Sequence, residues 1–217
     1  MNREELVEKL DAGELVRGVT LERLDLSGLD LGGSLLEGVV FDECRFAGTS
    51  LREAVLVGCS FGACDMSGAD LQLLQCHGGR FVATNLSGAR LVAAQITDSA
   101  FTGADLSRAD LEVGAFWRCD FSGARLAEAR LERAAFVEAT LASADLSGTQ
   151  LVTTSMVAAD LSTAVLTGAR FEGAMLVDAR LSGQVLRGQS LARTNFLRSD
   201  LTGCDLRDCD LTQCNFQ

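Results

Sequence analysis

Apolar side chains recur at every fifth position of this 217-residue chain, without interruption from Leu21 to Phe216. The forty central positions hold 25 Leu, 11 Phe, two Met, one Ile and one Cys, and they include every Phe of the protein. The residue two before each centre is mostly Ala, Cys, Ser, Thr or Gly, and Asp or Asn often stands directly before the centre. Sixteen of the 22 glycines lie two residues after a centre, so the recurring unit is Ala-Asp-Leu-Ser-Gly, as at 144–148.

A period of five fits neither an α-helix, with a period of 3.6, nor a β-strand, with a period of two, so the pattern predicts a repeat architecture. Each pentad offers one large and one small inward side chain, and this single apolar face is buried only when turns of chain stack on one another. Glycine two residues after the centre is typical of a type II turn, which requires a positive φ at its third residue. A right-angled bend at every pentad closes a coil in about four pentads, or roughly twenty residues.

Forty consecutive units of this kind resemble the repeats of the pentapeptide-repeat family, and the resemblance covers residues 19–217. It implies an all-β fold, a right-handed quadrilateral β-helix of about ten four-sided coils. The handedness rests on the resemblance alone. The repeat has no insertion from 21 to 216, unlike the loop-bearing resistance members of the family, so we expect a loop-free β-helix without their loop-mediated contacts.

Residues 1–18 precede the repeat and form the other predicted unit. Asn2 followed by Glu5 is typical of a capping box, and Gly13 is a typical helix stop. These signals predict a short helix over about 3–11. Because the end of a solenoid exposes its core and unpaired backbone, we expect this helix to cover the first coil.

The repeat continues to Phe216 with no capping sequence after it. The resemblance implies a homodimer through this end, because several family members dimerise there, and Leu211 and Phe216 are the residues we assign to the contact. A frayed or shortened end is the alternative interpretation.

The composition indicates a cytoplasmic, non-secreted protein. No apolar run approaches the ~18 residues of a membrane span, and no signal-peptide pattern is present. Seven of the eight Cys occupy the small inward position and Cys76 a centre, so packing in a reducing compartment explains them as free thiols. Cys44 and Cys64 lie one coil apart but point the same way, and the five-residue spacing of Cys204, Cys209 and Cys214 is too wide for zinc.

Candidate chemistry is sparse. The chain has one His, one Lys, no Tyr and no glycine-rich phosphate loop before a helix. His77 is predicted to point outward, with no nucleophile or orienting carboxylate at a useful spacing. The many Asp residues before centres are typical of turn residues that bond local backbone. We therefore predict no enzyme activity and assign no catalytic, cofactor-binding or metal-binding residue.

Taking every fourth pentad together sorts the centres into four faces. Face 1 begins at Leu21 and carries a predicted stack of five phenylalanines, at 41, 61, 81, 101 and 121. Face 4 begins at Leu36 and carries a second phenylalanine cluster, at 116, 136, 196 and 216. We interpret both clusters as core.

Face 4 also has the clearest surface signal. Its residues directly after the centre are apolar on five successive coils, and we call this row the apolar ladder: Trp117, Val137, Val157, Val177 and Leu197. The residues before its centres include Leu35, Val55, Ala115, Ala135 and Met175, and we add Val55 and Met175 to the predicted contact. A contiguous apolar row beside the only Trp indicates a protein interface. The alternative is that Val and Leu merely suit a β surface.

Charge favours a second hypothesis. Residues 19–217 carry 25 acids and 16 bases, a net of −9, and the resemblance extends to acidic rods that imitate duplex DNA and occupy the DNA-binding saddle of type II topoisomerases. The partner would then be DNA gyrase or topoisomerase IV, and the effect protection against a gyrase poison such as a quinolone. Duplex DNA as long as ten coils, about 48 Å, would carry about 28 charges, roughly three times as many. We assign Asp120, Asp160 and Asp200, aligned on face 1, to this alternative, and the acidic sign excludes direct nucleic-acid binding.

Overall fold

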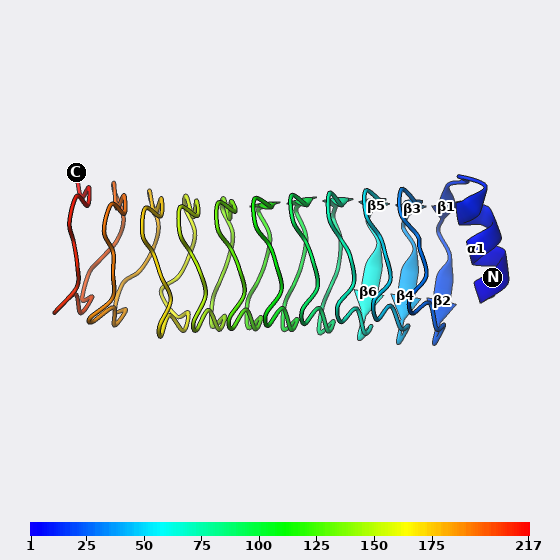
Figure 1. The fold of residues 1–217 in the computed structure, drawn as a ribbon, viewed down its shortest axis with the longest axis horizontal. Coiled ribbons are helices and arrows are strands. Elements are labelled where there is room, and N and C mark those ends of the chain that lie inside the picture. The colour runs from blue at the N-terminus through cyan, green and yellow to red at the C-terminus, as the bar shows by residue number, and fades with distance from the viewer.

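The computed structural model describes all 217 residues and shows an elongated rod of stacked coils with one helix at its N-terminal end (Figure 1). Consecutive coils pair in parallel, twenty residues apart, from Val16 and Leu36 at one end to Asn195 and Asn215 at the other. At twenty residues per coil, the 199 residues of 19–217 make about ten coils. The predicted quadrilateral β-helix is therefore confirmed.

The strands are short because a turn interrupts the chain in every pentad. Face 4 carries one sheet and face 1 another, and beyond them the same pairing continues as single bridges on all four faces. The face 4 sheet contains β1 (Val16–Arg17), β3 (Leu35–Glu37), β5 (Val55–Val57), β7 (Gln75–His77), β8 (Gln95–Thr97) and β9 (Ala115–Trp117), and the face 1 sheet contains β2 (Thr20–Glu22), β4 (Val40–Asp42) and β6 (Ser60–Gly62).

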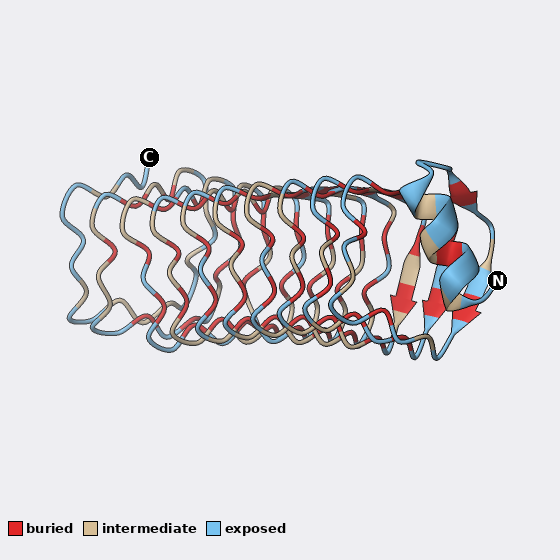
Figure 2. Ribbon diagram, turned by 45° about the vertical axis from the view of Figure 1, so that its right-hand side comes forward, coloured by how far each residue is buried: buried red, intermediate tan, exposed pale blue.

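The core fills the inside of the rod. Every centre from Leu21 to Phe196 is buried, and Figure 2 shows the buried positions following each coil. The five phenylalanines of face 1 stack with neighbouring ring centroids 4.7–5.0 Å apart. On face 4, Phe116 and Phe136 stack at 4.9 Å. The predicted face 1 stack is confirmed. The predicted face 4 cluster is split into the pairs Phe116–Phe136 and Phe196–Phe216, because Met156 and Leu176 hold the two centres between them, and Phe216 is half-exposed. At about 1.5–3 kcal/mol for each buried side chain the centres supply the main stabilising term.

The small inward position has a hydrogen-bonding role that its size alone did not predict. Many of the polar side chains there donate to the carbonyl group 23 residues earlier, as Thr49 does to Leu26 (2.7 Å) and Cys59 to Leu36 (3.4 Å). The eight Cys are free thiols, and burial raises the pKa of Cys119 to about 11 and that of Cys76 to about 12. The cysteines therefore serve as small core residues with a weak donor.

The bend in each pentad uses a positive φ at the residue two after the centre. This conformation occurs at every such position from Gly18 to Gln213 except Thr163. Many of these residues are not glycine, for example Glu53 (φ 61°) and Leu73 (φ 58°). Glycine therefore eases the bend but is not required for it, because pairing with the adjacent coils holds the conformation.

The N-terminal helix α1 spans Arg3–Asp11, as predicted. The Asn2 side chain accepts a hydrogen bond from the Glu5 backbone N–H (2.9 Å), and the Asn2 backbone N–H donates to the Glu5 carboxylate (3.0 Å). Leu6 is buried against the first coil, and Gly13, at φ 69°, ends the helix. With nine residues, α1 is too short to cross a membrane, and it is the only helix in the structure.

The last coil exposes its inward side chains. Leu211 is exposed and Phe216 is 47% exposed, whereas the centres before Leu201 are buried. Phe216 stacks on Phe196 with ring centroids 5.2 Å apart, so only one of its faces is covered. The C-terminal end of the rod thus presents an open apolar surface.

Candidate interaction surface

Stacking at twenty-residue intervals places the apolar ladder in register along face 4. Trp117 on β9 pairs with Thr97 on β8, and parallel bridges then continue along the column before the centres from Ala115 to Asn195. The ladder residues therefore lie one above another on consecutive coils, as predicted. Their spacing is about 4.8 Å, the distance between hydrogen-bonded strands.

The ladder is continuous but shallow. Trp117 is 50% exposed, and the other four ladder residues are half-buried. Met175, in the column before the centres, is 46% exposed. Val113, an exposed apolar residue, lies at the corner between faces 3 and 4, on the opposite edge of face 4 from the ladder. Sequence reasoning missed Val113, although an apolar residue at a turn position usually held by glycine was a visible signal.

Val55 is separated from the ladder. Two coils with polar outward residues lie between Val55 and Ala115, and they carry Gln75, His77, Gln95 and Thr97. Together with Val55 and Val57 these side chains line a hollow of about 250 Å³. Val55 therefore lies two polar coils away from the column that begins at Ala115, and its part in a contact surface stays a prediction.

Face 4 lacks charged side chains beside its centres. From Val55 onward no Asp, Glu, Lys or Arg directly precedes or follows a face 4 centre. Charges lie at the two corners that flank it. The corner with face 3 carries Arg133 and Arg193, and at the corner with face 1 Arg118 pairs with Asp98 (2.7 Å) and Arg198 with Asp178 (2.6 Å). Hydrogen bonds from Arg118 and Arg198 lower the pKa of both Asp carboxyls. The apolar ladder is thus a neutral strip on a chain of net charge −11.

The other faces carry columns of alternating charge. On face 3, Asp70, Arg90, Asp110 and Arg130 stand on consecutive coils, and the Arg130 guanidinium lies 3.8 Å from the Asp110 carboxylate. Arg170 occupies the same column. Opposite charges one coil apart largely cancel each other's field beyond the surface.

The acids assigned to DNA mimicry follow the same pattern. Asp160 and Asp200 stand in one face 1 column with Arg180 between them, and Arg180 lies 3.2 Å from Asp160. Thr140 separates Asp120 from Asp160. Each of the three aspartates also accepts the backbone N–H two residues further on, at 2.9–3.0 Å. Their predicted role in turns is confirmed, and they do not form an unbroken acidic row.

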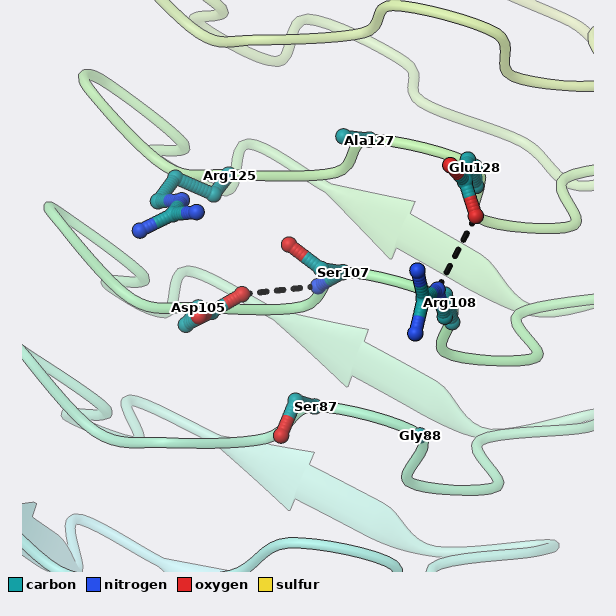
Figure 3. A pocket seen from close by; sticks show the side chains of 8 residues that line it. All are labelled: Ser87, Gly88, Asp105, Ser107, Arg108, Arg125, Ala127 and Glu128. Atoms are coloured by element: carbon teal, nitrogen blue, oxygen red, sulfur yellow. Dashed lines mark hydrogen bonds and ion pairs between the residues drawn. The ribbon is translucent and has the colours of Figure 1, made fainter.

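The largest hollow, about 530 Å³, lies on another face and is polar (Figure 3). There Arg108 donates to the Glu128 carboxylate (2.9 Å) and the Ser107 backbone N–H donates to Asp105 (2.9 Å). The hollow's lining contains no His or Cys, and no group of His, Cys, Asp or Glu anywhere in the structure is arranged to hold a metal ion.

His77 has neighbours that sequence reasoning missed. Coil stacking brings Asp98 to 3.5 Å and the Thr97 hydroxyl to 2.9 Å from its Nδ1 atom, so the expectation of no nearby carboxylate is wrong. Both neighbours approach the same ring nitrogen, whereas a relay needs the carboxylate and the nucleophile on opposite nitrogens. Asp98 also holds Arg118 through two hydrogen bonds. The cluster is therefore a surface hydrogen-bond network.

The fold defines a class: a four-sided parallel β-solenoid built from five-residue units. The family profile described as pentapeptide repeats matches eight copies, over residues 34–72, 76–112, 119–156, 154–183 and 185–217. Because these segments cover most of the chain, the chain belongs to the pentapeptide-repeat family.

Two solved structures of trypsin-treated QnrB1, a plasmid-mediated fluoroquinolone resistance protein, have the same fold. One is 19% identical with a TM-score of 0.64 over 94% of this chain and 91% of that chain, and the other is 21% identical with a TM-score of 0.52 over 92% of both. HetL from Nostoc sp. strain PCC 7120, a protein involved in heterocyst differentiation regulation, is 28% identical, with a TM-score of 0.44 over 99% of this chain and 96% of that chain. No curated protein matches the sequence.

Proposed function

We propose that the protein is a non-enzymatic, rigid cytoplasmic scaffold on which a partner protein docks through the apolar ladder of face 4. The observation that carries the proposal is the neutral apolar strip from Trp117 to Leu197 on a rod whose other faces are charged. A half-exposed Trp beside smaller apolar residues has the composition of an interface anchor, which contributes roughly 2 kcal/mol or more to binding.

The test is the substitution Val157→Glu at the middle of the ladder. A carboxylate forced against an apolar partner surface loses its hydration, so we expect binding to weaken roughly 100-fold or more. The fold remains intact because Val157 points outward. Capture of partners from the lysate of the native host, read by mass spectrometry with the wild type alongside, identifies the protein that is lost, and titration of that protein measures the change.

The matched control is Val152→Glu. Val152 also follows a centre directly and is also half-buried, but it lies on face 3. We expect this variant to bind like the wild type and to melt at the same temperature as Val157→Glu. Equal binding by Val157→Glu and the wild type would contradict docking on face 4.

A second candidate function is mimicry of DNA toward a type II topoisomerase, DNA gyrase or topoisomerase IV, with protection against its inhibition. The rod shape and the net charge of −9 over the repeats favour it. The fold that the chain shares with a fluoroquinolone resistance protein also supports it. The alternating charge columns weaken it.

The scaffold also offers an end-to-end contact. We propose that the open apolar surface at Leu211 and Phe216 meets a second copy of the chain, because an exposed core end buries apolar area when it is covered. The resulting homodimer would present two apolar ladders on one longer rod.

A further inference from the structure

The ladder of backbone hydrogen bonds between coils is broken across two adjacent faces at one place; elsewhere within the rod only single bonds are missing, as at Ala63 and Ser143. On each face, three backbone N–H groups normally join consecutive coils: those of the centre, of the residue before it and of the residue two after it. The centres of face 2 include Leu146, Leu166 and Leu186. Between the coils of Leu146 and Leu166 all three bonds are intact, for example from the Leu146 N–H to Val165 O at 2.9 Å. Between 164–171 and 184–190, five of the six such bonds on faces 2 and 3 are missing.

We call this break the seam. It lies where the ribbon passes from yellow to orange in Figure 1. The one bond that remains joins the Gly173 N–H to the Ala192 carbonyl at 2.9 Å. The N–H groups without their inter-coil acceptors belong to Leu166, Gly168, Phe171, Val185 and Ser190.

Gln184 explains the separation on face 2, because it occupies the small inward position. Its Nε2 donates to Leu161 O (2.7 Å), the carbonyl 23 residues earlier that a Thr or Cys would use. It also donates to Ala164 O (2.9 Å), which is the regular acceptor for the Val185 N–H. Since a Gln side chain is longer than Thr or Cys, these contacts require the two backbones to move apart.

Two further residues extend the distortion. Gln189 holds the small position on face 3, where its Nε2 donates to Leu166 O (2.9 Å) and its buried Oε1 has no donor. Thr163 is the one turn residue without a positive φ, and its hydroxyl accepts the Ser143 N–H (2.9 Å) in place of a backbone carbonyl. Val185, 66% exposed, borders a hollow of about 280 Å³ that opens there.

The same two coils stay joined on the other two faces. On face 4 the Leu176 N–H donates to Asn195 O (2.8 Å) and the Asp178 N–H to Leu197 O (2.9 Å). On face 1 the Leu161 N–H donates to Arg180 O at 2.8 Å. Face 4 keeps all three of its bonds, and face 1 keeps two, losing only the one from the Thr163 N–H at its corner with face 2. Two joined faces that share an edge, opposite two open faces, have the geometry of a hinge along that edge.

We propose that the seam is a joint at which residues 184–217 bend toward the edge between faces 4 and 1. The apolar ladder lies beside this edge, since its residues follow the face 4 centres on the way to face 1. Val177 stands before the joint and Leu197 beyond it, so bending turns the end of the ladder inward around a bound partner. A bent ladder fits a convex apolar surface. Only this use of the motion rests on the proposed function; the joint itself does not.

Residue-resolved hydrogen exchange of the free protein tests the joint. We expect the amides of Leu166, Gly168 and Val185 to exchange about tenfold or more faster than the equivalent amides one coil earlier and one coil later. The later coil separates a local seam from fraying at the end of the rod. Protection that declines smoothly toward the C-terminus would overturn the proposal.

Two variants test the cause. Gln184→Thr combined with Gln189→Thr restores the side chains that fit this position, so the three amides become protected. Thr84→Gln places the long side chain in the same column five coils earlier, and we expect it to expose the amides of Met66, Gly68 and Asn85. Unchanged exchange in both variants would show that the glutamines do not make the seam.

The direction of bending needs a distance measurement. Spin labels are attached to non-canonical amino acids, so that the native thiols are not labelled. One pair of labels replaces Gln95 and Asn215 on face 4, and the other replaces Ser87 and Arg207 on face 2. The two positions of each pair are six coils, or about 29 Å, apart. We expect the distribution of label-to-label distances on face 4 to include shorter values and that on face 2 to include longer values. Both distributions should become narrower in the Gln184→Thr, Gln189→Thr variant. Matching distributions on the two faces would overturn the bend.

Discussion

A carboxylate directly before a centre closes the turn that follows it. Asp105 accepts the Ser107 backbone N–H at 2.9 Å, and Asn85 accepts the Ser87 N–H at 3.1 Å from the same position. Either side chain satisfies a donor that no other coil reaches, which explains why Asp and Asn share this position. The carboxylates are therefore structural whether or not a partner also uses their charge.

These aspartates predict acid-sensitive stability. Hydrogen bonds from the Thr202 hydroxyl and backbone N–H lower the pKa of Asp200. Burial opposes the ionisation of Asp160, but the hydrogen bonds from Ser162 outweigh this effect and lower the pKa of Asp160 as well. A folded-state pKa below the unfolded value gives stability that is present above about pH 4 and is lost as the pH falls through the folded value. We expect the melting temperature to be level above about pH 5 and to fall toward pH 2.

Thermal melts followed by circular dichroism at a series of pH values check this expectation. Asp160→Asn keeps the acceptor and removes the titration, so it should lose slightly less stability in acid than the wild type. A melting temperature unchanged from pH 5 to pH 2 would show that the turn carboxylates contribute no pH dependence.

At the scale of the coil, much of the architecture could be predicted from the sequence. The five-residue register alone placed the centres, the turns and the phenylalanine stack of face 1, because each pentad must bury one face against its neighbours. The same register predicted the apolar ladder. Contacts between coils were harder to predict. Asp98 lies beside His77 only because the coils stack. The apolar outward residues of face 4 were assigned to one contact surface, but polar coils separate Val55 from Ala115.

The seam shows why a deviation is harder to interpret than a repeat. Gln184 and Gln189 were visible as long residues at a small position. Their consequence depends on which carbonyl groups they capture, and the repeat pattern contains no information on that. The Thr and Cys bonds to the carbonyl 23 residues earlier likewise became evident only from the paired coils.

The last coil carries a prediction of its own. If the end at Leu211 and Phe216 meets a second copy, Phe216→Glu should leave a monomer, because it places a carboxylate in the contact. The change spares the fold, since Phe216 lies in the last coil and is 47% exposed. Sedimentation equilibrium over a range of concentrations measures the assembly. Asn215→Glu, at the neighbouring exposed residue on the side of the rod, is the control and should still dimerise; a monomeric wild type at every concentration would contradict the contact.

For the whole molecule, charge separates the two candidate functions. A DNA mimic must present negative potential over the length of a partner's saddle, and the rod carries a net of −9 where DNA of similar length carries about 28 charges. Its columns alternate in sign, with Arg180 beside Asp160. A partner that reads neutral apolar surface is compatible with this pattern, because it does not depend on a long-range field.

Conversion of Asp120, Asp160 and Asp200 to Asn tests mimicry without disturbing the rod. Asn195 already accepts the Leu197 N–H (3.0 Å) from the equivalent position on face 4, so each Asn keeps the turn bond while the repeat charge changes from −9 to −6. Mimicry predicts binding to DNA gyrase that weakens about tenfold or more in this variant and falls steeply with added salt. Docking on face 4 predicts that the triple variant binds the partner like the wild type at every salt concentration, whereas Val157→Glu does not. Titration of gyrase and of any captured partner with both variants measures the two outcomes. Loss of gyrase binding in the triple variant alone would refute docking on face 4. Loss of partner binding in Val157→Glu alone would refute mimicry.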